Sequence, residues 1–213
     1  SRIENVGVRA QYGTAADGAD ITVRSAAGNI HLAGRADEGT GALAMGRYAA
    51  IGHHGSESDF DAHGDITVEG GNLKLQAGAF RGNGAQIGHG GDGTANYLYT
   101  DAVSQGILAG AIAIDAGGDV SLTGGDLLTG SNLAGTSFVG HGGWQRNEEK
   151  SGDIGIEAAG RVELIASATG EGGEVRVGHG GMAAAGDLSG AINVGVGTGI
   201  ELQGGDGVGS SAQ

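Results

Sequence analysis

The chain has 213 residues, of which 49 are glycine and none is proline or cysteine, and its formal net charge is −14. The lack of cysteine excludes a disulfide-stapled fold, and the acidic balance with scattered lysine and arginine argues against nucleic acid or anionic lipid as a partner. No stretch approaches the roughly 18 apolar residues that a membrane-spanning helix needs, so no membrane insertion is expected.

The first recurring element is a short alternating segment that we name strand A. Apolar residues at every second position are typical of a strand with one buried face. The starting isoleucines are separated by 45, 46, 42 and 38 residues, which sets the length of the repeat. Strand A is predicted at 21–23, 66–68, 112–114, 154–156 and 192–194.

A second alternating pair, strand B, begins seven to nine residues after the start of strand A. Gly-Asn, Gly-Asp or Gly-Gly lies between many of these runs, and such dipeptides favour turns. The predicted apolar pairs of strand B are Ile30/Leu32, Leu73/Leu75, Val120/Leu122, Val162/Leu164 and Ile200/Leu202.

A third element, strand C, ends in the phrase aliphatic-Gly-His-X-Gly. This phrase occurs at 51–55, 87–91, 139–143 and 177–181. Val6-Gly7-Val8 takes the place of the same phrase near the start of the chain, with Val8 in the position of the histidine. A phrase that returns every few dozen residues indicates a repeat architecture.

These elements predict an all-β fold, a right-handed parallel β-helix (solenoid) with three short strands per repeat of about 38–46 residues. With one turn per repeat, Ile66 should lie over Ile21 and Leu75 over Leu32, about 4.8 Å apart. Two turns per repeat remain an alternative, because Leu43, Phe80 and Leu133 precede strand C by six to eight residues.

We predict a single repeat array over residues 1–213, with about five units that start and end inside a repeat. On this interpretation the sequence is a slice of a longer protein, and the strand edges at its two ends favour end-to-end association. The length of the repeat varies mainly in two places, as between residues 92 and 106, which indicates surface loops.

The pattern Gly-Asp-Ile-X-Val, Gly-Asn-Leu-X-Leu and Ala-X-Ile-Gly-His-Gly-Gly, carried by residues 64–75 and 85–91, resembles a known family. It is similar to the repeats of filamentous-haemagglutinin-like adhesins, which are large two-partner-secretion or autotransporter-type exoproteins of Gram-negative bacteria. The resemblance implies a stalk or adhesive filament that is secreted or held at the cell surface. The secretion domain of that family is not present in this sequence.

The four histidines of the phrase are the most regular polar residues of the chain: His53, His89, His141 and His179. Alternation along strand C places them on the face of the core aliphatic residues, and Val8 fits the same inward position. We expect a structural ladder of neutral imidazoles with pKa values below 6.5, because burial disfavours the charged form. A metal site is the competing hypothesis, but a straight stack does not converge on one ion.

Three other features suggest sites less directly. The glycine before each histidine is expected to face outward, and either marks a corner or forms a flat groove for a chain or a glycan. Asp20, Asp65 and Asp153 precede strand A and are expected to bind local backbone amides. The Gly-Gly-Asp-Gly segments at 90–93 and 204–207 approach a calcium-binding repeat without meeting it, so calcium stays a minor alternative to no cofactor.

The charged segment 144–150 is expected to be a solvated loop, and we predict that the protein is not an enzyme. The leading hypothesis is a structural or adhesive segment whose partners are its own neighbouring repeats and a host-cell or matrix glycan or protein. The alternative is a carbohydrate-binding module that uses the aromatic residues Tyr97, Tyr99 and Trp144.

Overall fold

The structure is a computed structural model in which part of the chain is described, and all structural statements below concern that part. It comprises residues 18–26, 28–34, 49–53, 61–79, 83–91, 106–126, 134–143, 147–169, 172–181, 184–207 and 209–213. These residues form parallel β-sheets and no helix, so none of their segments is a helix that could cross a membrane. The prediction of an all-β fold is confirmed at this level.

Strand A is found in every repeat. Its members form one five-stranded parallel sheet, here sheet A, in the order β1-β5-β9-β13-β17. Ile21 pairs with Ile66, Ile112 with Ile154, and Ile154 with Ile192, so the aliphatic residues stack in rows. The strands are β1 (Ile21–Arg24), β5 (Ile66–Gly70), β9 (Ile112–Ala116), β13 (Ile154–Ala158) and β17 (Ile192–Val196).

Strand B behaves in the same way and forms sheet B, in the order β2-β6-β10-β14-β18. Leu32 pairs with Leu75 in parallel register, and Leu75 pairs with Leu122. The strands are β2 (Ile30–Ala33), β6 (Leu73–Gln76), β10 (Val120–Thr123), β14 (Arg161–Ile165) and β18 (Gly199–Gln203). Because equivalent strands are direct hydrogen-bonded neighbours in both sheets, the arrangement with one layer per repeat is confirmed and the two-layer alternative is wrong.

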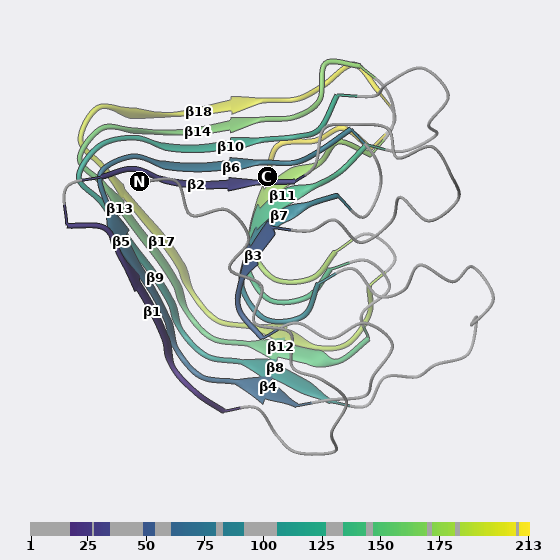
Figure 1. The fold of residues 1–213 in the computed structure, drawn as a ribbon. Coiled ribbons are helices and arrows are strands. Elements are labelled where there is room, and N and C mark those ends of the chain that lie inside the picture. The colour runs from purple at the N-terminus through teal and green to yellow at the C-terminus, as the bar shows by residue number, and fades with distance from the viewer. Residues whose placement is uncertain are drawn as a thin grey trace.

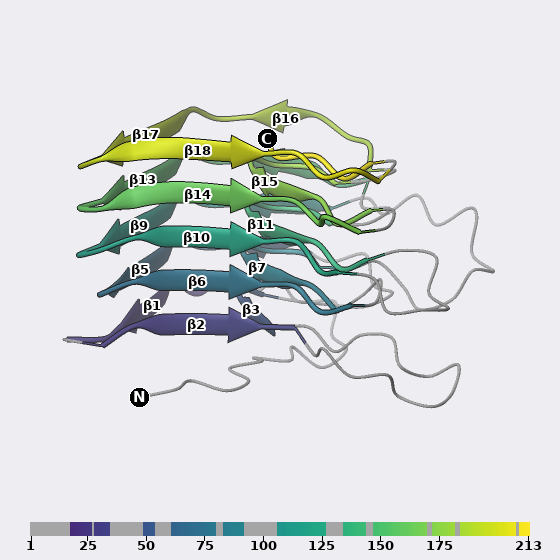
Figure 2. The same cartoon turned by 90° about the horizontal axis from the view of Figure 1, so that it is seen from above.

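Strand C forms a four-stranded sheet, sheet C, in the order β3-β7-β11-β15. Its strands are only three residues long: β3 (Ala49–Ile51), β7 (Ala85–Ile87), β11 (Ser137–Val139) and β15 (Val175–Val177). Ala212 continues this sheet through a single parallel bridge to Val175. Figure 2 shows how the members of a sheet follow one another in chain order along the stack.

Three strands per repeat was an underestimate, because a fourth element precedes strand A. This strand D forms its own parallel sheet, in the order β4-β8-β12-β16, and a glycine such as Gly110 joins it to strand A. Its strands are β4 (Ala62–His63), β8 (Ile107–Ala109), β12 (Glu149–Ser151) and β16 (Leu188–Ser189). The sequences Ala-His, Ile-Leu-Ala, Glu-Lys-Ser and Leu-Ser share no alternation, which is why the pattern did not reveal this strand.

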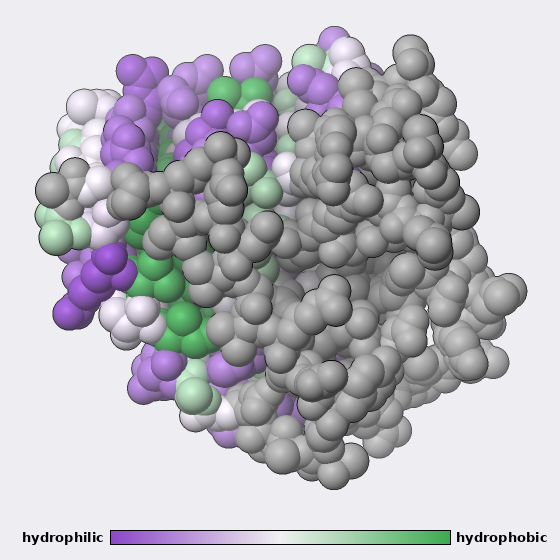
Figure 3. Space-filling view, viewed as in Figure 1, coloured by the Kyte–Doolittle hydropathy of each residue, from purple (hydrophilic) through white to green (hydrophobic). Residues whose placement is uncertain are grey.

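The apolar core lies between sheets A, B and C, which surround it on three sides in Figure 1. Every second residue of each strand points into it, as in β9, where Ile112 and Ile114 are buried while Ala113 and Asp115 are exposed. Figure 3 shows hydrophobic residues gathered inside a rim of hydrophilic ones in the same view. Sheet D lies outside this core, beyond the segment that follows strand C (Figure 1).

Candidate functional site: the histidine column

The segment after strand C, here the arc, is shaped by its glycines. The arcs comprise residues 52–53, 88–91, 140–143 and 178–181. Gly88 and Gly90 have φ angles of +147° and +113°, which residues with a side chain rarely adopt. A Cβ on Gly88 would also lie 1.9 Å from the carbonyl oxygen of Gly140 in the next repeat. The arcs therefore require glycine for both their conformation and their close stacking.

This close approach rules out the outward-facing glycine groove. Gly52, Gly88 and Gly140 are buried, and the carbonyl of the next arc occupies the space beside each of them. Consecutive arcs are joined by hydrogen bonds such as that from Gly140 N to Ile87 O, of 2.9 Å. Gly52, Gly88 and Gly140 therefore serve the stacking of the repeats and leave no surface there for a glycan or another chain.

The histidines of the arcs form one continuous stack of rings, which we call the histidine column: His53, His89, His141 and His179. Ring centroids are 5.0, 4.8 and 4.9 Å apart along the column, close to the spacing of parallel strands. The rings of His89, His141 and His179 are within 3° of parallel. The strand register thus places each imidazole directly against the next.

Each ring nitrogen of the column has a separate role. The backbone N–H of His89 donates to Nδ1 of His141 over 3.0 Å, and that of His141 donates to Nδ1 of His179 over 3.1 Å. An Nδ1 that accepts carries no proton, so Nε2 carries it in the neutral ring. Nε2 of His89 then donates to the carbonyl of Gly64 at 2.8 Å, and Nε2 of His141 to that of Gly110 at 2.9 Å.

The two bonds connect different parts of the fold. The Nδ1 bond joins one repeat to the next, whereas the Nε2 bond joins the end of a repeat to its own beginning, the corner before strand A. The same Nε2 contact ties His53 to the carbonyl of Ala19 and His179 to that of Gly152, at 2.8 Å each. The imidazoles therefore close each layer of the structure and also hold consecutive layers together.

Burial sets the charge state of the column. Desolvation lowers the pKa of His89 to about 4 and that of His141 to about 3, although the hydrogen bonds to Gly64 and Gly110 act in the opposite direction. The pKa of His179 is also lowered, mainly by burial, with smaller contributions from Arg176 and Lys150. For His89, His141 and His179, the expectation of a neutral, inward-facing imidazole agrees with these directions.

The column leaves little capacity for metal coordination. A ring nitrogen binds a metal through its lone pair. In His89 and His141 the Nδ1 lone pair accepts an amide hydrogen, and Nε2 carries the proton donated to a carbonyl. Within the described ranges, no group of three or more His, Asp or Glu side chains is placed to hold an ion. The donor chemistry of the column favours a structural role.

The carboxylates before strand A accept hydrogen bonds from backbone amides, but these amides are not the local ones that were expected. Oδ1 of Asp65 accepts from Ala111 N at 2.8 Å, and Oδ1 of Asp153 accepts from Ala191 N at 2.8 Å. Asp20 accepts from Asp65 N in the same way at 2.9 Å. In each case the amide belongs to the next repeat, so these side chains add further bonds along the stack axis.

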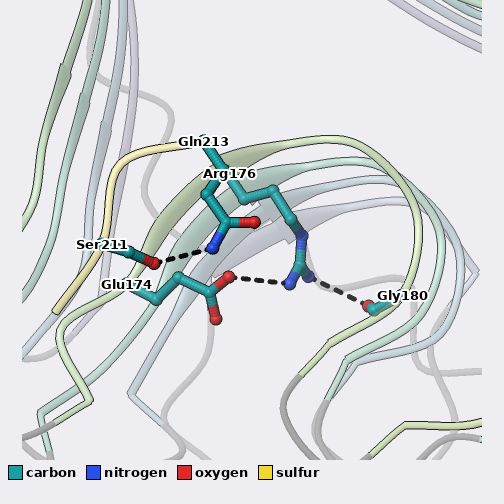
Figure 4. A network of polar contacts seen from close by, with 5 residues as sticks. All are labelled: Glu174, Arg176, Gly180, Ser211 and Gln213. Carbon is teal, nitrogen blue, oxygen red and sulfur yellow. Dashed lines mark hydrogen bonds and ion pairs between the residues drawn. The ribbon is translucent and has the colours of Figure 1, made fainter. Parts of the chain in front are cut away.

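The face of strand C opposite the core carries a second row, Ala50, Gln86, Phe138 and Arg176, of which Gln86 and Arg176 are polar. Gln86 is completely buried, and its Nε2 lies 3.0 Å from Gly140 O and 3.2 Å from Gly142 O in the next arc. Two repeats further on, Arg176 donates to Gly180 O and to the carboxylate of Glu174 at 3.0 Å each (Figure 4). Its guanidinium carbon lies 5.1 Å from the centroid of the Phe138 ring. This row braces the arcs from outside and was missed because its residue types do not repeat.

The segment 144–150 differs from its sequence-based description. Glu149 starts strand D in this repeat, and Glu148 and Lys150 are 1% and 0% exposed, so the prediction of a solvated loop was wrong for them. Lys150 pairs in register with Leu108 and Leu188, and its Nζ donates to the carbonyls of Glu148 at 2.5 Å and Ala185 at 2.8 Å. Strand D directs this side chain toward the arc, where a Cβ on Gly142 would lie 2.9 Å from Lys150 Cε.

Several sequence-predicted positions lie outside the described residues. These are Val8, in the histidine position of the first phrase, and the three aromatic residues proposed for glycan contact, Tyr97, Tyr99 and Trp144. The histidines outside the phrase do not join the column: His63 is exposed on β4 and His31 is half-buried on β2. Among the histidines of the described ranges, the structure brings together the four that share the arc position.

Replacing Gln86 by leucine should lower the free energy of unfolding by about 1–2 kcal/mol, because Gly140 O in the next arc would lose its side-chain donor, whereas Gly142 O keeps the amide of Gly91. Gln76, half-buried at the end of β6, provides the matched control, and Gln76→Leu should change stability by less than about 0.5 kcal/mol. Urea unfolding followed by circular dichroism measures both. Equal effects of the two substitutions would show that the bracing bonds of Gln86 contribute nothing.

Comparisons with protein-family models, with curated proteins and with solved structures give no match for this chain.

Proposed function

We propose that the chain is a stretch of right-handed parallel β-helix that serves as a rigid, non-catalytic stalk in a very large bacterial exoprotein. The observation that carries the proposal is the unbroken register of all four sheets, in which each repeat adds one strand to the strand of the previous repeat. A right-handed course follows from the strong preference of parallel strand connections for that hand. Such a stack grows in length and keeps a constant cross-section.

The polar residues of the stack support a mechanical role. Asp65, Asn72 and the column histidines all bond to the backbone of an adjacent repeat. These bonds run along the stack axis, in parallel with the strand pairing, so pulling the ends apart would load many of them together. Side chains whose polar atoms are used in this way are poorly placed to bind a substrate, which favours a scaffold over an enzyme.

The resemblance to filamentous-haemagglutinin-like adhesins supports a location outside a Gram-negative cell, with the stalk secreted or held at the surface. Its immediate partners would be neighbouring repeats, and contact with a host-cell or matrix glycan or protein would come from residues outside the stack.

Single-molecule stretching tests the stalk directly. The 213-residue chain would be held at its two ends between beads and extended at constant speed. A stalk should resist extension and then yield in steps of about one repeat, 38–46 residues, because each layer is held mainly by its neighbours. Gradual lengthening at low force would contradict the proposal. Binding on a glycan array that is lost on Tyr97→Ala or Trp144→Ala would favour the carbohydrate-binding alternative.

A further inference from the structure

The histidine column lies at the junction between the apolar core and sheet D. Each imidazole reaches from the arc to the glycine or alanine that precedes strand A, and strand D ends at that same corner. Sheet D packs on the outer side of the arcs: a Cβ on Gly90 would lie 3.0 Å from Leu108 Cδ1, and one on Gly180 would lie 3.5 Å from Leu188 Cδ1. The arcs are thus enclosed by the column on one side and by sheet D on the other.

The strands of sheet D pair with one another over only two or three residues. Its strands have two or three residues, whereas those of sheets A and B have four or five. Its inward residues Ala62, Leu108 and Lys150 are buried against the arcs and not in the core shared by sheets A, B and C. Segments with few apolar contacts and short ladders open at lower free energy than a central core.

We propose that the histidine column is an acid-sensitive clasp that releases the arcs and sheet D while sheets A, B and C stay folded. The geometry of Nδ1 carries the inference. In the neutral ring this nitrogen accepts the N–H of the preceding arc, as His141 does from His89. A proton taken from the solvent onto Nδ1 converts the acceptor into a donor that faces another donor, so the bond between the two repeats is lost.

The surroundings of the column increase the effect of protonation. Cations on neighbouring rings would lie only 4.8–5.0 Å apart. His179 faces Arg176 from strand C and Lys150 from sheet D, which both oppose a further positive charge. Protonation of His89 is opposed by His53 and His63 and favoured by Asp65. Protonation of His141 is opposed by the rings on either side of it, His89 and His179. Opening the arcs gives these imidazoles access to water and relieves the repulsion.

The pH dependence follows from proton counting. An opened arc has histidine pKa values near 6.5, whereas burial lowers the pKa to about 4 for His89 and about 3 for His141 in the closed state. Between these values the open state binds more protons than the closed state, so opening becomes easier as the pH falls. The equilibrium constant for opening should rise tenfold per pH unit for each histidine released, and should level off below the closed-state pKa.

Hydrogen exchange of the whole chain, followed by mass spectrometry between pH 7 and pH 4, tests the proposal. Protection factors, corrected for the intrinsic pH dependence of exchange, should fall first in residues 107–109, 140–143 and 149–151. Residues 112–116 and 120–123, in sheets A and B, should keep higher protection at every pH in this range. Equal protection of all these segments at each pH would mean a single cooperative unit, and would overturn the proposal.

Substitutions in the histidine column distinguish opening caused by these histidines from general unfolding at low pH. His141→Gln keeps an N–H donor for Gly110 O but cannot be protonated, so each opening takes up one proton fewer. The factor by which the protection of residues 140–143 falls per pH unit should therefore be ten times smaller than in the unmodified chain. His89→Gln repeats the measurement in the adjacent repeat should the first variant not fold. His31→Gln, on β2 and outside the column, is the control and should leave the slope unchanged. An unchanged slope in both column variants would show that the histidines do not control the opening.

Discussion

Ile112→Asp is expected to abolish the folded state of the two repeats around it. Ile112 is 1% exposed and stacks between Ile66 and Ile154 in the central strand of sheet A. The substitution removes most of a buried aliphatic side chain, which costs about 2–5 kcal/mol, and buries a carboxylate with no partner, which costs several kcal/mol more. The sum approaches the whole stability of an ordinary domain. Far-ultraviolet circular dichroism and thermal melting measure the loss.

The adjacent residue provides the control. Ala113 follows Ile112 in β9 but is exposed on the opposite face of the sheet, so Ala113→Asp places the same carboxylate in water. Its cost should stay below about 1 kcal/mol, which is the range of strand propensities. Comparable destabilisation by the two substitutions would mean that the alternation of faces in β9 is wrong.

Gly140→Ala is expected to have the second largest effect, a loss of about 3 kcal/mol or more in the free energy of unfolding. Gly140 has a φ of +150°, and a Cβ would lie 2.0 Å from the carbonyl oxygen of Gly178. The substitution therefore adds backbone strain of about 1–3 kcal/mol and forces the two arcs apart. Urea unfolding measures the loss, and the separation of the arcs should also make the neighbouring imidazoles accessible to water.

Gly155→Ala is the matched control, because this glycine lies in the regular part of β13. A Cβ there would be 4.0 Å from its nearest neighbour, Ile112 O, and the strand needs no special conformation at that position. Stability should be unchanged or should rise by about 0.4–1 kcal/mol, since alanine restricts the unfolded chain. If Gly140→Ala were equally harmless, the close stacking of the arcs would not be needed for the fold.

The strands of the core could be predicted from the sequence because each strand obeys a local rule. Alternation at 112–114 or 154–156 is visible without knowing any partner, and the repeat period then pairs Ile112 with Ile154. Strand D could not be found in this way. Lys150 occupies the position of Leu108 and Leu188, and only the packing against the arcs makes these residues equivalent.

The sequence predicted that the four histidines form a row, but it did not predict the hydrogen-bond partners of their ring nitrogens. The phrase Gly-His and the alternation along strand C place His89 beside Ile87 on the inward face, and the burial of both agrees with that reading. No sequence rule indicates that Nδ1 of His141 accepts from the arc of one repeat while Nε2 reaches Gly110, 31 residues earlier. These partners depend on how the arc bends back toward the corner before strand A.

What the sequence determined by itself is therefore periodic: which residues face inward, which residues stack, and where glycine interrupts the strands. These features depend on the local geometry of an extended chain and on one repeated spacing. Only the tertiary structure decided which residues from different elements contact one another. Examples are the burial of Glu148 and Lys150, the contacts of Gln86, and the close approach of Gly88 to Gly140. Such contacts join residues far apart in the chain, and their geometry is set by the stacking of whole repeats, which no local pattern encodes.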